Sequence, residues 1–443
     1  MEKSFSSKIG VLLAAAGSAV GLGSIWKFPY VVGEDGGGAF IIIYIACSLV
    51  FGMPLVMNEF MIGKLSGRSA YGAYRQLSGT NRWQWFAWTN LLTVTIVMSF
   101  YFVVTGWCIN YMVEAATNTF TGMDAAGLTA HFKVFERHAP QMLLYAIIAI
   151  VLTASVLWFD VNKGIERLSK ILMPLLFLIL IVMAVHMIFI DGGTTGLRYL
   201  FEPDFSKITS KVFLEAMGLS FFTLSVGVGC LVTYGGYMPK DQNVTSTSAQ
   251  MILLVIFVSL LAGMIIFPAV FAYGFSPSEG PELTFVTLPA VFQHMFSPTL
   301  ISVSFFALMC VAAITSTISM MEVMVAFACE ATAGTKWPLN RHQSVVVIAL
   351  IQVVTNSLCI MSMTGHADWL NVMGLNLFDS ANTLVTDFMI PLGALVAALF
   401  TGWFVPKAMY QGSRVATLTY KVILRWLVPI AIIIIFLDTL NII

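Results

Sequence analysis

The chain of 443 residues is 58% hydrophobic and only 10% charged, and its 22 basic residues balance its 22 acidic residues. Soluble domains usually carry about 25% charged residues, so this composition excludes a water-soluble globule. The neutral balance also offers no basic surface for nucleic acid and no acidic tail.

Apolar stretches long enough to cross a bilayer, about 20 residues each, follow one another along the whole chain. In chain order we predict eleven membrane spans, over 9–31, 38–62, 84–116, 141–159, 168–190, 212–237, 248–275, 299–329, 343–363, 373–403 and 420–441. The connections between them are short. We therefore expect an all-α polytopic membrane protein without a soluble domain.

The lysines and arginines are distributed unequally between the two sets of alternate connections. Most of them share the side of the N-terminus, and the other side holds Lys133, Arg137, Arg198, Lys207 and Lys211. Because cytoplasmic loops are enriched in Lys and Arg, we expect a multi-pass protein of the inner (plasma) membrane with a cytoplasmic N-terminus. An odd number of spans then places the C-terminus outside.

A short motif occurs twice, in the first and sixth predicted spans. Ala19-Val-Gly-Leu-Gly23 returns as Ser225-Val-Gly-Val-Gly229, five spans later. Because five is odd, the second copy crosses in the opposite direction, which is typical of an inverted-topology repeat. We expect one transporter domain over 1–443, with repeats at about 9–190 and 212–403 and an extra helix at about 420–441.

Two closely spaced glycines in each copy disfavour an unbroken helix. An alternative is that these small residues let helices pack closely. A matched pair in inverted halves favours two broken helices, because non-helical backbone at membrane depth survives only where it is buried or lines a polar cavity. We therefore predict a binding site at the breaks.

A broken helix exposes N–H groups that attract a carboxylate and carbonyl groups that attract a cation. Hydroxyls lie beside the breaks at Ser18, Ser24, Thr223 and Ser225, and Thr315-Ser316-Thr317 lies within the eighth span. Such hydroxyls often bond only to their own helix. Where they face the breaks, they are hard neutral oxygens that suit a small cation.

Few charged residues lie within the spans, and each is costly to bury. Lys27 follows the first break and Asp379 lies in the tenth span, so the two could form an ion pair that closes the outer side, although Lys27 could instead extend to the interface. Glu59 and Glu322 are interpreted as structural. No HExxH, GxSxG or P-loop motif is present, so no enzyme is expected.

Seven motifs in order resemble the neurotransmitter:sodium symporter family, especially its bacterial amino-acid transporters with the LeuT fold. They are Gly17-Ser-Ala-Val-Gly-Leu-Gly-Ser-Ile-Trp-Lys-Phe-Pro29, Gly36-Gly-Gly-Ala-Phe40, Lys163-Gly-Ile-Glu-Arg167, Phe221-Phe-Thr-Leu-Ser-Val-Gly227, Lys240-Asp-Gln242, Thr287-Leu-Pro289 and Ala312-Ala-Ile-Thr-Ser316. The resemblance implies a five-plus-five inverted repeat with broken first and sixth helices, alternating access, and sodium bound beside an amino acid.

By motif position, the resemblance also implies the ligands. The second sodium site would use carbonyls of Gly17, Val20 and Ala312 with the hydroxyls of Thr315 and Ser316. The substrate pocket would comprise Ser18, Ala19, Leu22, Gly23, Val97, Tyr101, Phe222, Thr223, Ser225, Val228, Ser316 and Met320. Tyr101 would contact the substrate carboxylate and Phe222 would cover the pocket, so both join Lys27 and Asp379 as gate residues. Gly21, where amine transporters carry an acid, favours an amino-acid substrate.

Other positions depart from the family pattern. The first sodium site would retain Ala19, Ser24 and Thr223, but Ser24 replaces an asparagine and Val255 replaces an asparagine or aspartate. Such losses weaken a cation site, because a buried ion needs its ligands. Lys27 replaces an arginine, and its acidic partner is Asp379 or, under another alignment, Asn382. Chloride use stays open, since Ser259 matches a chloride-site serine but Leu219 stands at a glutamine position.

The expected function is sodium-coupled import of a small hydrophobic or aromatic amino acid, with one strong sodium site and one doubtful one. Two alternatives remain: a proton-coupled or exchange carrier of the same fold, and a membrane sensor that binds the amino acid without transporting it. The expected partners are the amino acid and the lipid bilayer, with no nucleic acid and no obligate protein partner.

Overall fold

The computed structural model describes residues 4–190, 192–274, 283–295, 297–372, 374–404, 420–440 and 442. Positions 275, 373 and 441, at the ends of predicted spans, lie outside these ranges. The described chain is nearly all helical, and its only β-structure is two isolated bridges, Gly37 with Pro203 and Val372 with Leu375. This architecture agrees with the all-α prediction.

The α-helices and the shorter 3-10 or π turns (η) follow in chain order. They are α1 (Lys8–Ala19), η1 (Gly23–Lys27), α2 (Phe28–Glu34), α3 (Gly38–Cys47), η2 (Ser48–Gly52), α4 (Met53–Ser66), α5 (Ala70–Ser78), α6 (Trp85–Ala116), α7 (Ala125–Glu136), α8 (Ala139–Leu157), η3 (Asn162–Glu166), α9 (Arg167–Ile188), α10 (Thr194–Phe201), η4 (Phe205–Lys207), α11 (Ser210–Thr223), α12 (Cys230–Gly236), α13 (Val244–Ala272), η5 (Leu283–Thr287), α14 (Leu288–Gln293), α15 (Pro298–Thr332), α16 (Arg341–Met363), η6 (Asp368–Leu370), α17 (Leu377–Thr383), η7 (Leu384–Met389), α18 (Ile390–Leu399), η8 (Phe400–Phe404), η10 (Ile423–Leu427) and α20 (Val428–Thr439).

Within the described ranges, nine continuous helices are long and apolar enough to cross a membrane, by length and composition. A tenth span is the pair Lys8–Ala19 and Gly23–Glu34, which is bent by 51° at its break. The predicted span 212–237 falls on α11 and α12, which are too short to span singly because a break separates them. The two predicted breaks therefore lie in the first and sixth spans.

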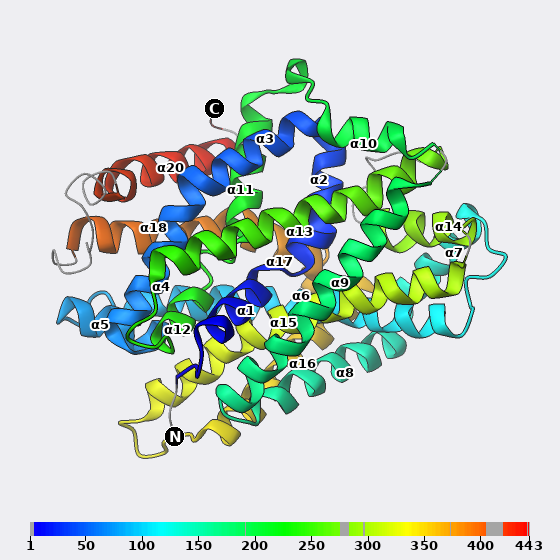
Figure 1. Cartoon of the computed structure of the whole chain (residues 1–443). Helices are drawn as coiled ribbons and strands as arrows, with labels where there is room; N and C mark the ends of the chain where they lie inside the picture. The colour runs from blue at the N-terminus through cyan, green and yellow to red at the C-terminus, as the bar shows by residue number, and fades with distance from the viewer. Residues whose placement is uncertain are drawn as a thin grey trace.

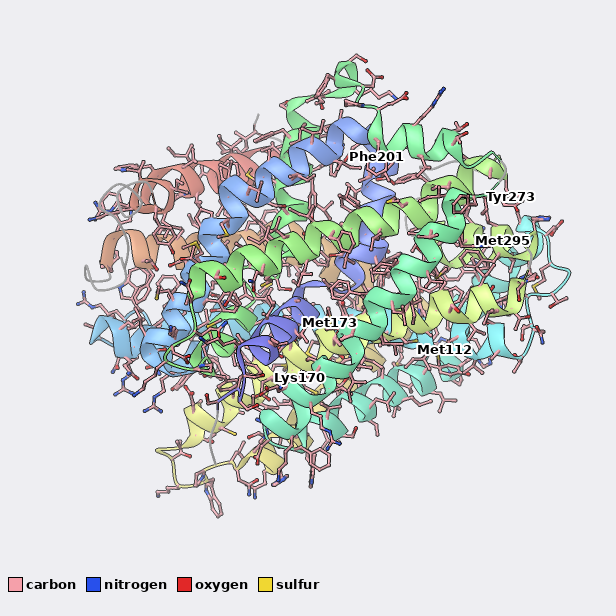
Figure 2. All side chains as sticks on the ribbon, in the orientation of Figure 1. Met112, Lys170, Met173, Phe201, Tyr273 and Met295 are labelled. Carbon is pink, nitrogen blue, oxygen red and sulfur yellow. The ribbon has the colours of Figure 1, made fainter. Side chains whose placement is uncertain are left out.

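The long helices lie side by side in one bundle (Figure 1). Helices α5 and α12 lie toward one end, and α7 and α14 lie toward the other (Figure 1). Side chains fill the space between the helices, and Met173 of α9 lies beside α1 (Figure 2). A Cβ added to Gly17 would lie 3.2 Å from the Met173 Sδ, so α1 is packed tightly against its neighbour where the site begins.

The N-terminal segment is attached to the start of α9. Ser7 caps α1, since its hydroxyl accepts a 3.1 Å hydrogen bond from the Gly10 N–H. The same hydroxyl donates to the Glu166 carboxylate at 2.7 Å, and Lys170 pairs with this carboxylate at 2.6 Å. These bonds hold the N-terminal end of α1 against the start of α9.

Candidate functional site

Both predicted breaks are present, and backbone conformation explains their positions. Helix α1 ends at Ala19, and helical geometry resumes as a π turn at Gly23. Helix α11 ends at Thr223, after which Ser225, Gly227 and Gly229 have φ of +54°, +80° and +87°. Left-handed backbone is cheap for glycine and uncommon for other residues, so the glycines of the motif allow the sixth span to unwind.

The unwound segment of the sixth span is held by buried polar side chains. Glu59 accepts a 2.6 Å hydrogen bond from the Gly227 N–H, and Asn90 donates a 2.8 Å bond to the Gly227 carbonyl. Both side chains are buried, at 1% and 3% exposure. Glu59 was expected to be structural because it is a carboxylate within a span, and it bonds to backbone. The role of Asn90 was not predicted from the sequence.

Hydroxyl groups join the two breaks to each other and to α15. The Ser225 hydroxyl donates to the Ser18 carbonyl at 3.0 Å. The Ser316 hydroxyl lies 3.3 Å from the carbonyls of both Gly17 and Ser18. The first, sixth and eighth spans therefore meet at one point.

A small central cavity of about 30 Å³ lies at this junction. The predicted substrate residues Leu22 and Thr223 do not line it, whereas Gly21 and Ile390 do, although neither was predicted to. Ile390 belongs to the tenth span, and nothing in its local sequence distinguishes it. The lining residues are Ser18, Ala19, Gly21, Gly23, Val97, Tyr101, Phe222, Ser225, Val228, Ser316, Met320 and Ile390.

The polar end of the cavity lies at the break of the first span. The Tyr101 hydroxyl accepts a 3.0 Å hydrogen bond from the Leu22 N–H. A Cβ added to Gly21 would lie 2.2 Å from the Ser316 Oγ and 2.6 Å from the Tyr101 hydroxyl oxygen. Only glycine fits here. Because the Tyr101 hydroxyl accepts from Leu22, its own hydrogen can be donated to a carboxylate beside the break.

The residues expected at the second sodium site lie beside the cavity. The Thr315 hydroxyl is 3.0 Å from the Ala312 carbonyl oxygen, and a Cβ on Gly17 would lie 3.3 Å from the Thr315 Cβ. Val20 follows the last residue of α1, where a helix leaves carbonyls without intrahelical donors. These neutral hydroxyl and carbonyl oxygens fit a small hard cation.

The expected first sodium site offers hydroxyl groups that already have partners. The Ser24 hydroxyl lies 3.5 Å from the Ala19 carbonyl oxygen, and the Thr223 hydroxyl lies 2.9 Å from that of Tyr44. Val255 is fully buried and contributes only apolar surface. The side chains at this position therefore offer hydroxyl groups, the backbone offers carbonyl groups, and Val255 offers no ligand.

On one side, Phe222 lines both the cavity and a vestibule of about 240 Å³, here named the outer vestibule after the orientation expected from the sequence. The Lys27 ammonium lies 4.8 Å from the centre of the Phe222 ring. Lys27 and Asp379 both line this vestibule, but the Asp379 carboxylate accepts a 2.7 Å bond from Asn376. Since the structure describes both residues and records no ion pair between them, their pairing as a gate stays a prediction.

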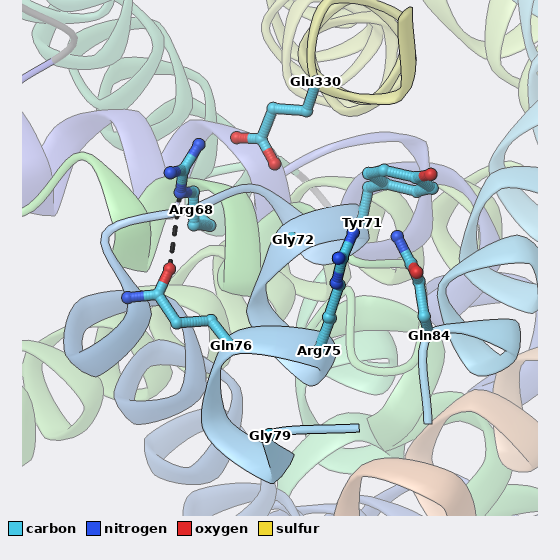
Figure 3. A pocket seen from close by; sticks show the side chains of 8 residues that line it. All are labelled: Arg68, Tyr71, Gly72, Arg75, Gln76, Gly79, Gln84 and Glu330. Carbon is cyan, nitrogen blue, oxygen red and sulfur yellow. Dashed lines mark hydrogen bonds between the residues drawn. The ribbon is translucent and has the colours of Figure 1, made fainter. Parts of the chain in front are cut away.

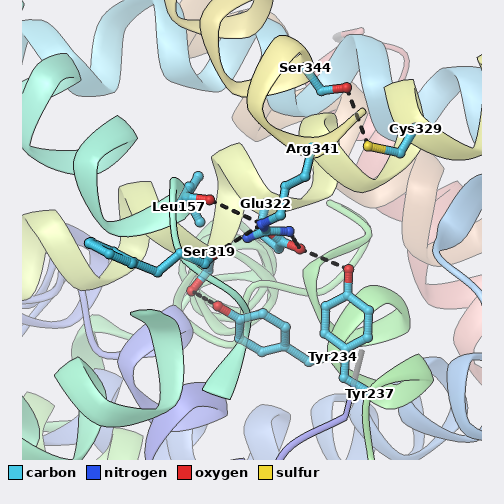
Figure 4. A network of polar contacts seen from close by, with 9 residues as sticks. Leu157, Tyr234, Tyr237, Ser319, Glu322, Cys329, Arg341 and Ser344 are labelled. Carbon is cyan, nitrogen blue, oxygen red and sulfur yellow. Dashed lines mark hydrogen bonds and ion pairs between the residues drawn. The ribbon is translucent and has the colours of Figure 1, made fainter. Parts of the chain in front are cut away.

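At the opposite end, a buried ion pair joins several helices (Figure 4). Arg341 makes a bidentate pair with Glu322, at 2.9 and 2.7 Å, and the Tyr237 hydroxyl donates to Glu322 at 2.8 Å. Arg341 also donates to the Leu157 carbonyl at 3.0 Å. Glu322, which was interpreted as structural, thus links the residue that follows α12 to α15 and α16.

A separate hollow of about 430 Å³ lies beside α5 and contains none of the predicted site residues (Figure 3). Arg68 donates from its Nε to Gln76 at 3.4 Å, and Glu330 accepts a 2.9 Å bond from the Ser69 N–H. The hollow is therefore not part of the central site.

Two spans broken at mid-depth around a central cavity are typical of secondary transporters. A model described as the sodium:neurotransmitter symporter family matches residues 2–136 and 137–442. The sodium-dependent transporter YhdH of Bacillus subtilis is 37% identical over 446 residues, which cover 99% of this chain and 98% of YhdH. A sodium-dependent transporter of Haemophilus influenzae is 30% identical over 457 residues, with 99% and 98% covered.

Among solved structures, this chain is similar to that of MhsT in complex with L-phenylalanine, with a TM-score of 0.90 and 34% identity. The match covers 99% of this chain and 100% of MhsT. The chain therefore belongs to the sodium:neurotransmitter symporter family and has the LeuT fold. It is a multi-pass membrane protein of a family of sodium-dependent transporters, which are not enzymes.

Proposed function

We propose that this protein is a sodium-coupled symporter that imports a hydrophobic or aromatic amino acid by alternating access. The observation that carries the proposal is the junction of both breaks, where the Leu22 N–H and the Tyr101 hydroxyl lie together. An amino-acid carboxylate at this position would meet donors, and the apolar wall of Val97, Val228 and Met320 would contact its side chain. The phenylalanine bound to the similar MhsT supports this choice of substrate.

Sodium would bind at Gly17, Val20, Ala312, Thr315 and Ser316 and would supply the driving force. This position joins the first and eighth spans, so a cation there favours the conformation in which the two spans are in contact. We propose one strong sodium site, because Val255 and Ser24 leave the other with few ligands. Substrate would favour closure of Phe222, followed by separation of Arg341 and Glu322 on the other side.

The orientation we propose has a cytoplasmic N-terminus in the inner membrane. In support, Lys8 pairs with Asp241 at 3.0 Å, and α1 is bonded through Ser7 to Glu166, which is close in sequence to Lys163, Arg167 and Lys170. This end of the molecule is thus enriched in the residues that face the cytoplasm.

The test is uptake of labelled L-phenylalanine into proteoliposomes under an inward sodium gradient or an inward proton gradient. We expect accumulation that requires sodium. Uptake that ignores sodium and follows protons would favour the proton-coupled alternative, and saturable binding without accumulation would favour a sensor. Either result would refute the proposed symport.

A further inference from the structure

Lys27 lies between two outer chambers that hold different acids. One is the outer vestibule, which the carboxylates Asp379 and Glu136 line. The other, here named the acidic chamber, has a volume of about 250 Å³ and is lined by the carboxylates Glu34, Glu215, Asp387 and Asp438. Lys27 and Phe222 line both chambers, so the position of the ammonium depends on which acid attracts it.

The Asp379 carboxylate is stabilised without a lysine partner. It lies in the first turn of α17, where a carboxylate is stabilised by the helix dipole. Its own N–H and its carboxylate are both bonded to Asn376, at 2.9 and 2.7 Å. This local arrangement satisfies the charge at the surface of the bundle.

Asp387 is in the opposite situation. It lies well inside the span Leu377–Phe404, where an unpaired carboxylate is costly. Thr386 donates to it at 2.8 Å, and no described cation lies within ion-pair distance of it. Lys27 lines the same chamber as Asp387, and Glu215, another acid of that chamber, is already paired with Lys211 at 3.5 Å.

The local backbone determines where Asp387 lies. It belongs to η7, a π turn of Leu384–Met389 that packs against α11 and α20. The adjacent Phe388 stacks on Phe436 of α20, with ring centres 6.2 Å apart. Such π turns change which residues of a helix share a face and are frequent at functional sites.

We propose that Asp387, rather than Asp379, is the carboxylate that positions Lys27 over the Phe222 ring, and that this pair controls closure of the outer side. The inference rests on the proposed transport function. A lysine carries a compact charge that cannot bridge two distant acids as a guanidinium fork can. Lys27 therefore couples the acidic chamber to Phe222, which in turn covers the central cavity.

The experiment measures outer access to the cavity directly. A cysteine introduced by Val97→Cys lies below Phe222, and its labelling rate with a membrane-impermeant methanethiosulfonate reports how often the outer side opens. We expect Asp387→Asn to raise this rate about tenfold, within the usual range of coupling between sites. Asp387→Glu should restore the original rate, whereas Asp438→Asn, which removes another acid of the same chamber, should leave it unchanged.

Lys27→Met provides the coupling test. If the two residues act as a pair, Lys27→Met combined with Asp387→Asn should label no faster than either single variant, because contacting residues are not additive. Equal labelling of Asp387→Asn and the parent, or faster labelling with Asp379→Asn instead, would overturn the proposal. If Asp387→Asn does not fold, a labelling rate of Asp387→Glu that differs from that of the parent would overturn it as well.

Sodium-driven phenylalanine uptake by the protein without any of these substitutions keeps the two proposals distinct. The labelling rates depend on the conformation of the protein and not on its substrate. Absent uptake with the expected labelling pattern would reject the proposed substrate and retain the Lys27–Asp387 pair, and sodium-driven uptake with unchanged labelling would do the reverse.

Discussion

Replacing Thr315 by valine tests the proposed sodium site with the least disturbance of the fold. Valine has nearly the same shape, and the Thr315 hydroxyl bonds only to carbonyls of its own helix, Val311 and Ala312, both at 3.0 Å. A bound sodium ion would lose one oxygen ligand. Interactions with charged groups are worth about 1.5–3 kcal/mol, so sodium affinity should fall by about 10- to 150-fold.

The assay is a sodium titration of labelled phenylalanine binding to the purified protein, with the half-saturating sodium concentration as readout. Thr317→Val is the matched control, because the Thr317 hydroxyl faces Thr153 of α8 at 2.8 Å and not the site. Adding Ser316→Ala to Thr315→Val should abolish sodium-stimulated binding. The same half-saturating concentration in Thr315→Val and the parent would refute the assignment.

Three further predictions concern the pocket, the proposed weaker cation site and the Arg341–Glu322 pair. Gly21→Ala places a Cβ 2.2 Å from the Ser316 Oγ, and this overpacking of about 1–3 kcal/mol should weaken phenylalanine binding measured at saturating sodium. Thr223→Val should change the half-saturating sodium concentration less than Thr315→Val does, because Thr223 already bonds to Tyr44; a larger change would assign sodium to the first site. Arg341→Met leaves Glu322, whose side chain is 0% exposed, without a counter-charge, so we expect a loss of about 3–5 kcal/mol, read as a lower Tm in detergent and reduced by adding Glu322→Gln.

The sequence predicted the spans well because hydrophobic length is a local property. The span expected at 84–116 is α6, Trp85–Ala116, and that expected at 343–363 is α16, Arg341–Met363. The short connecting helices α5, α7 and α14 were not predicted, since a search for about 20 apolar residues does not detect them. The breaks could be predicted because glycine favours left-handed backbone that other residues rarely adopt, and the structure confirms both breaks.

Contacts between segments that are distant along the chain could not be predicted from the sequence. Glu322 and Arg341 lie on different helices, and only their packing brings the two charges together. Asp387 was not predicted as a partner for Lys27, because the sequence does not show that it lies within a π turn, Leu384–Met389, which changes the face that it presents. The pocket residues of the broken helices were accessible through their motifs, whereas Ile390 lies in no motif.

The close contact between Gly393 and the unwound segment offers a way to observe the buried site from the lipid side. A Cβ on Gly393 would lie 2.1 Å from the Gly227 carbonyl oxygen, so α18 must shift whenever that segment repacks. The neighbouring Leu392 is 40% exposed, while five of the six native cysteines are buried and Cys329 is intermediate. An environment-sensitive fluorophore on Leu392→Cys would convert ligand arrival into an optical signal without a probe in the cavity.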